Sequence, residues 1–261
     1  MYKRIKDYFK SNPSRLYVRL IVLVYLLFSY NTFPGWWYSL IGTLLIILLA
    51  RICWEDEYLE WIGLRIEPKA FFFCLLFLIV IAFGSFQLIT FIARGSHVSF
   101  SLISFTAFLH IIGYTLNEEI VLGAILINFI QKRFKKLNQF YTSILVAVAF
   151  PLLHYIFYRW IFLDKGIICI SSLVSLFAVG AIRNNLILRT GHIGYSWALH
   201  VGWAFIMFGF VHTKTITTKI LSEPEKFNLY LGSPIMVLIL TFMAILSFLL
   251  LLQKRQDISR S

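Results

Sequence analysis

The sequence predicts an all-α, polytopic membrane protein of about eight transmembrane helices. Hydrophobic residues make up 59% of its 261 residues and charged residues only 14%, whereas about a quarter of the residues in a soluble domain are charged. The mean hydropathy is +0.80, because the apolar residues gather in long runs that resemble membrane spans. Basic residues flank these runs. We therefore expect one integral membrane domain over residues 1–261.

The expected spans follow one another with short connections. The first is short and carries Arg19 near its start, where a long side chain reaches the interface. The fourth is longer than a bilayer requires, so we expect it to tilt or protrude. In chain order the spans are 16–30, 36–53, 70–93, 101–130, 141–162, 167–188, 192–211 and 230–252.

The distribution of Lys and Arg predicts the orientation. If the N-terminus is cytoplasmic, 18 of the 24 basic residues fall on the cytoplasmic side and six on the other, as the positive-inside rule requires. We expect an integral protein of the cell membrane (plasma or inner), with both termini cytoplasmic. The formal net charge of +12 lies in short clusters beside the spans, which suit anionic lipid headgroups. No nucleic-acid partner is expected.

Four ionisable residues lie well inside the expected spans, where charge is costly and marks functional sites. Glu118 and Glu119 are adjacent in the fourth span, His154 lies in the fifth and His200 in the seventh. Neighbouring helical residues point about 100° apart, so one carboxylate can face a central site while the other supports it. Four further histidines lie at span ends and are weaker candidates: His97, His110, His192 and His212.

Two carboxyl groups and two imidazoles form a sufficient set for amide hydrolysis. A buried carboxylate can accept a proton from water, and an imidazole can hold that water or polarise a carbonyl. No cofactor is required. A metal remains open, because Glu and His also bind zinc, but the chain has no HExxH pair. A structural alternative is an ion pair between the glutamates and Arg183 or Arg159.

The order of these motifs resembles the CAAX-protease and bacteriocin-processing (CPBP) family, the glutamic-type intramembrane proteases that include Abi proteins and Ras-converting enzymes. "EEIVLG" is similar to the family's Glu-Glu-x-x-x-Arg motif at Glu118 and Glu119. "FPLLH" matches Phe-x-x-x-His at Phe150 and His154, and "HVGWA" matches His-x-x-x-Asn at His200. The resemblance covers roughly residues 60–210 and implies a four-helix catalytic core there.

The resemblance implies a role for each matched residue. Glu118 would deprotonate a water, His154 would position it or polarise the scissile carbonyl, and His200 would donate to the oxyanion, while Glu119 would support the geometry. Two motif residues differ, because Gly123 replaces the arginine and Ala204 replaces the asparagine. Either other groups substitute, or the chain has lost proteolysis; the groups available are Arg183, Asn184, Asn128 and the Trp203 indole.

An intramembrane endopeptidase is the function that these residues favour, with a peptide or protein substrate within or beside the membrane. One rival is a non-catalytic immunity or assembly protein on the same scaffold, which the two departures favour. A proton-coupled transporter is another, although no inverted repeat is visible. A b-type haem protein with His154 and His200 as axial ligands would leave both glutamates unexplained. The sequence does not fix the oligomeric state.

Overall fold

The computed structural model describes residues 14–32, 36–93, 97–100, 103–157, 169–214 and 223–260. Within these ranges the chain is helical apart from one short strand pair, so the predicted all-α class is confirmed. Five helical stretches there are long and apolar enough to cross a membrane, which indicates a membrane protein. These are Trp37–Trp61, Pro68–Ile92, Phe105–Arg133, Ile170–Thr190 and Pro234–Gln253.

The first part of the chain forms a helical pair and a long apolar helix. The pair is followed by two short helical turns, so the helical stretch that we expected to end at residue 53 continues to Trp61. Pro68 then begins the long helix, at a position where its missing N–H costs no hydrogen bond. The elements are α2 (Ser14–Thr32), α3 (Trp36–Trp54), η1 (Glu55–Glu57), α4 (Tyr58–Trp61) and α5 (Pro68–Ile92).

A nearly continuous helix carries the two glutamates. It consists of α6 (Phe105–Glu118), the π-helical segment η2 (Glu119–Ile125) and α7 (Leu126–Arg133). The Ser104 side chain accepts a hydrogen bond from the Ala107 N–H and caps α6, as is usual at helix starts. All seven residues of η2 are buried. A π-helical segment within an α-helix is rare and often marks a functional site.

The rest of the chain supplies the helices that carry the two histidines. Gly191 has a positive φ of 79° and ends α10, in the left-handed conformation that glycine adopts readily. The next helix begins at Gly194, so His192 lies in the turn between the two helices. The elements are α8 (Gln139–Phe157), α10 (Ile170–Thr190), α11 (Gly194–Ala204), the π-helical η3 (Phe205–Phe210), α12 (Glu223–Tyr230) and α13 (Pro234–Arg260).

Two short strands, which the sequence did not predict, pair in the same region as the end of η3. Strand β1 (His97–Phe100) runs antiparallel to β2 (Val211–Lys214), with His97 opposite Lys214. The side chains of both strands, including those of His97 and His212, lie outside the described part of the structure.

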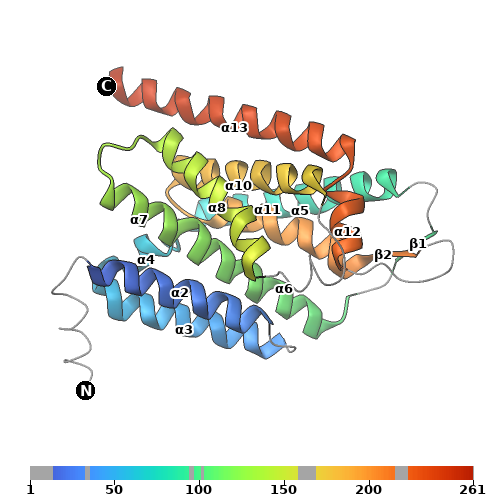
Figure 1. The fold of residues 1–261 in the computed structure, drawn as a ribbon, viewed down its shortest axis with the longest axis horizontal. Helices are drawn as coiled ribbons and strands as arrows, with labels where there is room; N and C mark the ends of the chain where they lie inside the picture. Colours follow the sequence, from blue (N-terminus) through green and yellow to red (C-terminus); the bar gives the residue numbers. More distant parts are fainter. Residues whose placement is uncertain are drawn as a thin grey trace.

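The helices that carry the glutamates and Arg183 lie in the interior of the helical assembly. In Figure 1, α13 runs along one side, and α2 and α3 pack together along the opposite side below α6 and α7. The most apolar part of Phe105–Arg133 is 72% buried and that of Ile170–Thr190 is 61% buried, against 17% for α5 and α13. Helices α5 and α13 therefore offer mainly outward apolar surface, while α6, η2 and α10 provide protected positions for charged groups.

Candidate functional site

The four predicted site residues come together from three helical segments. Glu118 ends α6 and Glu119 begins η2, while His154 lies on α8 and His200 on α11. Glu118 is 3% exposed, Glu119 0% and His154 8%, and the His200 side chain is half-buried. Charged groups so far from water need close partners of their own. The structure supplies such partners.

Glu118 lies between the two imidazoles. Its Oε2 is 3.8 Å from Nε2 of His154 and 3.8 Å from Nε2 of His200. His154 is held from behind, because its Nδ1 donates a hydrogen bond of 2.9 Å to the Phe150 carbonyl oxygen. Polar groups that are more than 3.5 Å apart are commonly bridged by a water.

Glu119 points to a different set of partners. Its Oε1 lies 3.1 Å from Nδ1 of His200 and 3.6 Å from Nη1 of Arg183. His200 therefore stands between the two carboxylates, with one ring nitrogen toward each. This arrangement agrees with the expectation that adjacent carboxylates on a helix point in different directions.

Arg183 corrects one part of the charge count made from the sequence. It is one of the 18 basic residues that the sequence analysis assigned to the cytoplasmic side, but it lies inside α10 and is only 1% exposed. Its Nη2 donates to the Leu122 carbonyl oxygen at 3.0 Å, and its guanidinium lies 4.2 Å from the centre of the Phe150 ring. A buried charge needs such partners, so Arg183 is part of the site.

The two motif departures lie beside the cluster. Gly123 is on η2, and a Cβ built there would lie 3.5 Å from Oε2 of Glu119 and 2.8 Å from the Ile187 side chain of α10. The glycine therefore lets α10, and Arg183 with it, come close to Glu119. Ala204 lies one helical turn after His200 and is 1% exposed.

The groups considered as substitutes differ in where they lie. The Asn184 amide donates to the Ser143 carbonyl oxygen at 3.0 Å, and Asn128 donates to the carbonyl oxygens of Glu60 and Trp61. Neither lines the cavity next to the cluster, whereas Arg183 and Trp203 do.

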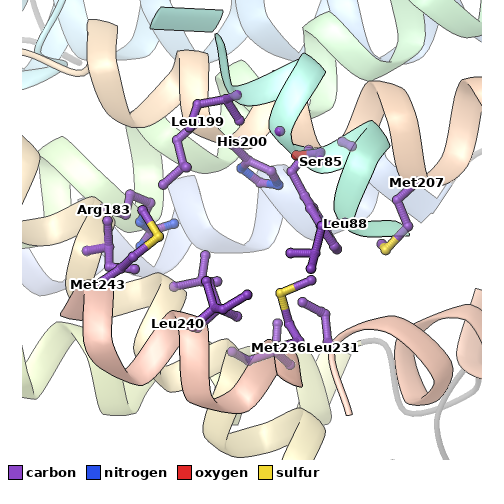
Figure 2. Close-up of a pocket in the computed structure, with 18 of the residues that line it drawn as sticks. Ser85, Leu88, Arg183, Leu199, His200, Met207, Leu231, Met236, Leu240 and Met243 are labelled. Carbon is purple, nitrogen blue, oxygen red and sulfur yellow. The ribbon is translucent and has the colours of Figure 1, made fainter. Parts of the chain in front are cut away.

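A largely apolar cavity of about 600 Å³ adjoins the cluster. Its volume is in the range of small-molecule sites. In Figure 2, Arg183 and His200 border the cavity from neighbouring helices, with Met243 beside Arg183 and with Leu231 and Met236 across from His200. Its polar groups include Glu119, His154 and Ser196; the methionines are Met207, Met236 and Met243. An apolar part of a ligand can thus lie in the cavity while a polar bond of the same ligand contacts the cluster.

Some features of the site had no signal in the sequence. Ser196 is an ordinary serine in an apolar helix, and Tyr114, whose ring lies edge-on to His200 with centroids 6.1 Å apart, is one of 13 tyrosines. Of the weaker histidines, His110 packs against Tyr114 and His192 lies in the turn before α11. Neither histidine belongs to the cluster.

The described side chains include no group of three or more His, Cys, Asp or Glu residues that is arranged to hold a metal ion. No protein-family model matches the chain, and no curated protein matches it in sequence.

Proposed function

We propose that this protein is a glutamic-type intramembrane endopeptidase of the CPBP kind. It hydrolyses a peptide bond in a membrane-associated or exported protein, and Glu118 activates the attacking water. One observation carries the proposal: a buried carboxylate oxygen lies 3.8 Å from Nε2 of two imidazoles on different helices. General base catalysis needs a carboxylate in this position, with donors and acceptors fixed around it.

The hydrogen-bond partners determine which ring nitrogens carry protons. The Phe150 carbonyl oxygen can only accept, so Nδ1 of His154 carries its proton and Nε2 offers a lone pair in the neutral ring. The Glu119 carboxylate accepts from Nδ1 of His200 in the same way. Glu118 Oε2 and the two Nε2 atoms are then three acceptors around one point. A single water can donate to only two of these three acceptors, so the cluster needs one additional proton on one of them.

The charge of the cluster leads to the same conclusion. Two carboxylates and one guanidinium sum to a net charge of −1, which is unfavourable in a buried site. One additional proton makes the cluster neutral. We assign that proton to His200, because His200 lies against Glu119 at 3.1 Å and also faces Glu118. His200 is then an imidazolium with an Nε2–H donor.

The reaction follows from this arrangement. The water oxygen attacks the scissile carbonyl carbon, and one water proton passes to Glu118. The electrons of the carbonyl π bond move to its oxygen, where the His200 Nε2–H stabilises the new charge. His154 orients the water through Nε2. The C–N bond then breaks and Glu118 returns its proton to the leaving nitrogen, giving a new carboxyl terminus and a new amino terminus.

Glu119 and Arg183 hold this geometry. The Glu119 carboxylate fixes the tautomer and orientation of the His200 ring, as a second carboxylate commonly does for a catalytic imidazole. Arg183 compensates the charge of Glu119 at 3.6 Å. Arg183 thus takes the role of the motif arginine, whose position in this chain is occupied by Gly123.

The remaining features of the proposal concern the membrane. We propose that eight helical segments cross it, with both termini cytoplasmic in the cell membrane and with residues 60–210 forming the catalytic core. Helix α8 and the α11–η3 segment, which carry His154 and His200, would then be shorter crossings than the five long ones. The proposed reaction uses no cofactor.

The deciding experiment compares protein termini in cells. Strains carrying wild type, Glu118→Gln, Glu119→Gln, His154→Ala or His200→Ala as the sole copy are compared by mass spectrometry of membrane and secreted protein termini. Glu118→Gln and His154→Ala should accumulate an uncleaved precursor that wild type processes, with cleavage reduced at least a hundredfold. Arg189→Met, on the exposed end of α10, is the matched control.

A non-catalytic membrane protein is the second candidate. The buried contact between Arg183 and Glu119 favours it, because such a pair can serve structure alone. In that case all five strains would give the same termini, and Glu118→Gln would leave the phenotype of the cells unchanged.

A further inference from the structure

A hollow lined by basic side chains lies at the connection between α7 and α8. It has a volume of about 760 Å³, and no acidic side chain is among its lining residues. Its basic lining residues are Lys132, Arg133, Lys135 and Lys136, and its apolar ones include Phe134 and Leu145. Cations that are gathered in this way repel one another, and an anion placed among them relieves that repulsion. The hollow therefore suits an anionic group with apolar surface beside it.

Two of the four cations have partners of their own, and two do not. Lys132 pairs with Glu57 at 3.2 Å, and Nε of Arg133 donates to a tyrosine hydroxyl of α2 at 3.1 Å. Lys135 and Lys136 are exposed, and the described residues give them no hydrogen bond and no ion pair. These two lysines are therefore available to a ligand, and replacing them breaks no described contact.

One face of α8 is apolar and exposed from its first turn to its last. Tyr141, Leu145, Val148, Leu152 and Tyr155 recur at intervals of three and four residues, which places them on one side of the helix. Each is between 43% and 55% exposed, so the described residues leave this stripe open. Over its 14-residue span it measures about 21 Å, against about 15 Å of hydrocarbon in one leaflet. Because Leu145 also lines the hollow, the basic hollow and the apolar stripe are continuous.

We propose that the hollow and the stripe together bind one phospholipid with an anionic headgroup. The phosphate lies between Lys135 and Lys136, and an acyl chain runs along the stripe from Leu145. A phospholipid fits better than a soluble anion, because it carries a negative group and a long apolar chain in the order in which the protein presents their complements. The inference does not depend on the proposed proteolysis.

The expected orientation places this site in the leaflet that holds such lipids. In Figure 1 the α7–α8 connection lies at the same end of the helical assembly as the end of α13, and the Lys and Arg distribution predicts a cytoplasmic position for both. The cytoplasmic leaflet is the negatively charged one, because it contains anionic lipids.

A lipid bound at this site would hold α8 from its open side. On the other side of the helix, Ala147 and Phe150 are buried and lie against Gly180 of α10. The stripe faces away from that contact. A ligand that binds the folded protein on the stripe should therefore stabilise the position of α8, the helix that carries His154.

The experiment follows the thermal stability of the purified full-length protein in neutral detergent at fixed ionic strength. Dioleoyl phosphatidylglycerol is added at increasing mole fractions, and the rise in Tm gives the apparent affinity. Dioleoyl phosphatidylcholine has the same chains without net charge, and inorganic phosphate has no chain. We expect phosphatidylglycerol to raise Tm more than either of them, and native mass spectrometry should show one retained molecule of it.

Three variants locate the site. The double variant Lys135→Gln/Lys136→Gln should lower the affinity for phosphatidylglycerol about thirtyfold and keep the Tm of wild type without lipid. Leu145→Gln should lower the affinity on the order of tenfold, because it removes apolar contact with the chain. The matched control is Arg65→Gln/Lys69→Gln, which removes two exposed charges around the start of α5 and should bind the lipid like wild type.

The inference is wrong if phosphatidylcholine raises Tm as much as phosphatidylglycerol, since the hollow would then select no charge. It is also wrong if inorganic phosphate gives the full rise or if Leu145→Gln binds like wild type, because the stripe would then hold no chain. Equal losses in the two double variants would assign the effect to the total basic charge instead of this hollow. None of these measurements uses cleavage, so each outcome leaves the proposed function standing.

Discussion

A single glycine explains how an arginine from another helix reaches Glu119. Gly123 follows Glu119 by four residues, and Ile187 follows Arg183 by four residues on α10, so each pair shares a helix face. The Ile187 side chain would lie 2.8 Å from a Cβ at position 123. Position 123 therefore has room only for a small side chain where the face of α10 that carries Arg183 packs against η2.

We predict that the size of the side chain at position 123 determines both stability and processing. Gly123→Ala needs only a small shift of the end of Ile187, and it should keep activity. Gly123→Leu overfills the contact, so it should cost about 1–3 kcal/mol of stability, separate Arg183 from Glu119 and abolish processing. The measurement is Tm in neutral detergent, followed by precursor cleavage in cells.

Gly84→Leu is the control for stability, because a Cβ at Gly84 on α5 would meet nothing within 4 Å. If Gly123→Leu and Gly84→Leu gave the same Tm, close packing at Gly123 would not be the reason for the glycine.

The sequence predicted the four site residues but not all of their partners. Glu118, Glu119, His154 and His200 stand out because charge is rare in apolar runs. Arg183 was seen as a possible ion-pair partner, yet it was also counted among the cytoplasmic charges, although it falls inside the expected span 167–188 and inside α10. Which helix packs against which is a property of contacts between distant segments, and no local pattern records it.

At the scale of elements, the turn that begins α11 depends on a neutral histidine. His192 lies between α10 and α11, and its Nδ1 accepts a hydrogen bond of 3.1 Å from the Gly194 N–H. A protonated ring could not accept this bond. Burial lowers the pKa of His192 from the ordinary histidine value of 6.5, which likewise favours the neutral ring. Because α11 also carries His200, this turn helps to set the position of the site.

We predict a loss of stability on acidification that arises from His192. A lowered pKa in the folded state means that the contribution is complete above pH 6.5 and is lost as the pH falls through the folded pKa. Tm of wild type should therefore fall between about pH 7 and about pH 5. His192→Asn keeps an acceptor without titrating near neutrality, so its Tm should fall less over the same range; parallel curves would contradict the prediction.

The main apolar segments follow one another in the expected order, but in the described residues five helical stretches are long and apolar enough to span a membrane, against eight expected spans, and their ends and internal breaks differ. Apolar length predicted the segments that became α3, α5 and α13. It did not predict η2 and η3, because an i to i+5 hydrogen-bond pattern leaves no mark in apolar spacing. It also missed β1 and β2, whose four residues each are too few to show alternation.

At the scale of the whole molecule, the outward apolar surface and the buried charges are separated by helix. Large exposed apolar residues concentrate on α5 and α13, while the charged cluster lies on α6, η2 and α10 with the two histidines beside it. This arrangement is expected of a protein whose solvent is the bilayer. Large exposed apolar side chains on the two outer helices include Phe72, Ile79, Val80, Phe83, Leu238, Phe242, Ile245 and Leu249.

We predict that the two ends of the α6–η2–α7 helix face opposite sides of the membrane. The exposed positions Thr106 and Lys135 lie just inside its start and just after its end, and the Lys and Arg distribution predicts a cytoplasmic position for residue 135. In a background with the three native cysteines replaced by serine, a membrane-impermeant maleimide should label Thr106→Cys in intact cells. It should label Lys135→Cys and Gln253→Cys only after permeabilisation.

Labelling of Thr106→Cys and Lys135→Cys from the same side would contradict a membrane-spanning helix between them. Labelling of Gln253→Cys in intact cells would contradict the cytoplasmic C-terminus.

The π-helical segment η2 has a consequence for how one helix serves several neighbours. A π-helical turn contains an additional residue relative to an α-helix, so it changes the rotational phase of everything that follows. Helix α6 contacts mainly α3 and α11, while η2 also meets α10 and α8, and α7 meets α8. Deleting one residue from η2 would restore α-helical phase and turn the Lys132 end by about 100° relative to Glu118. One local irregularity thus sets how the face that carries Glu118 and the faces that pack against neighbouring helices are oriented along the same helix.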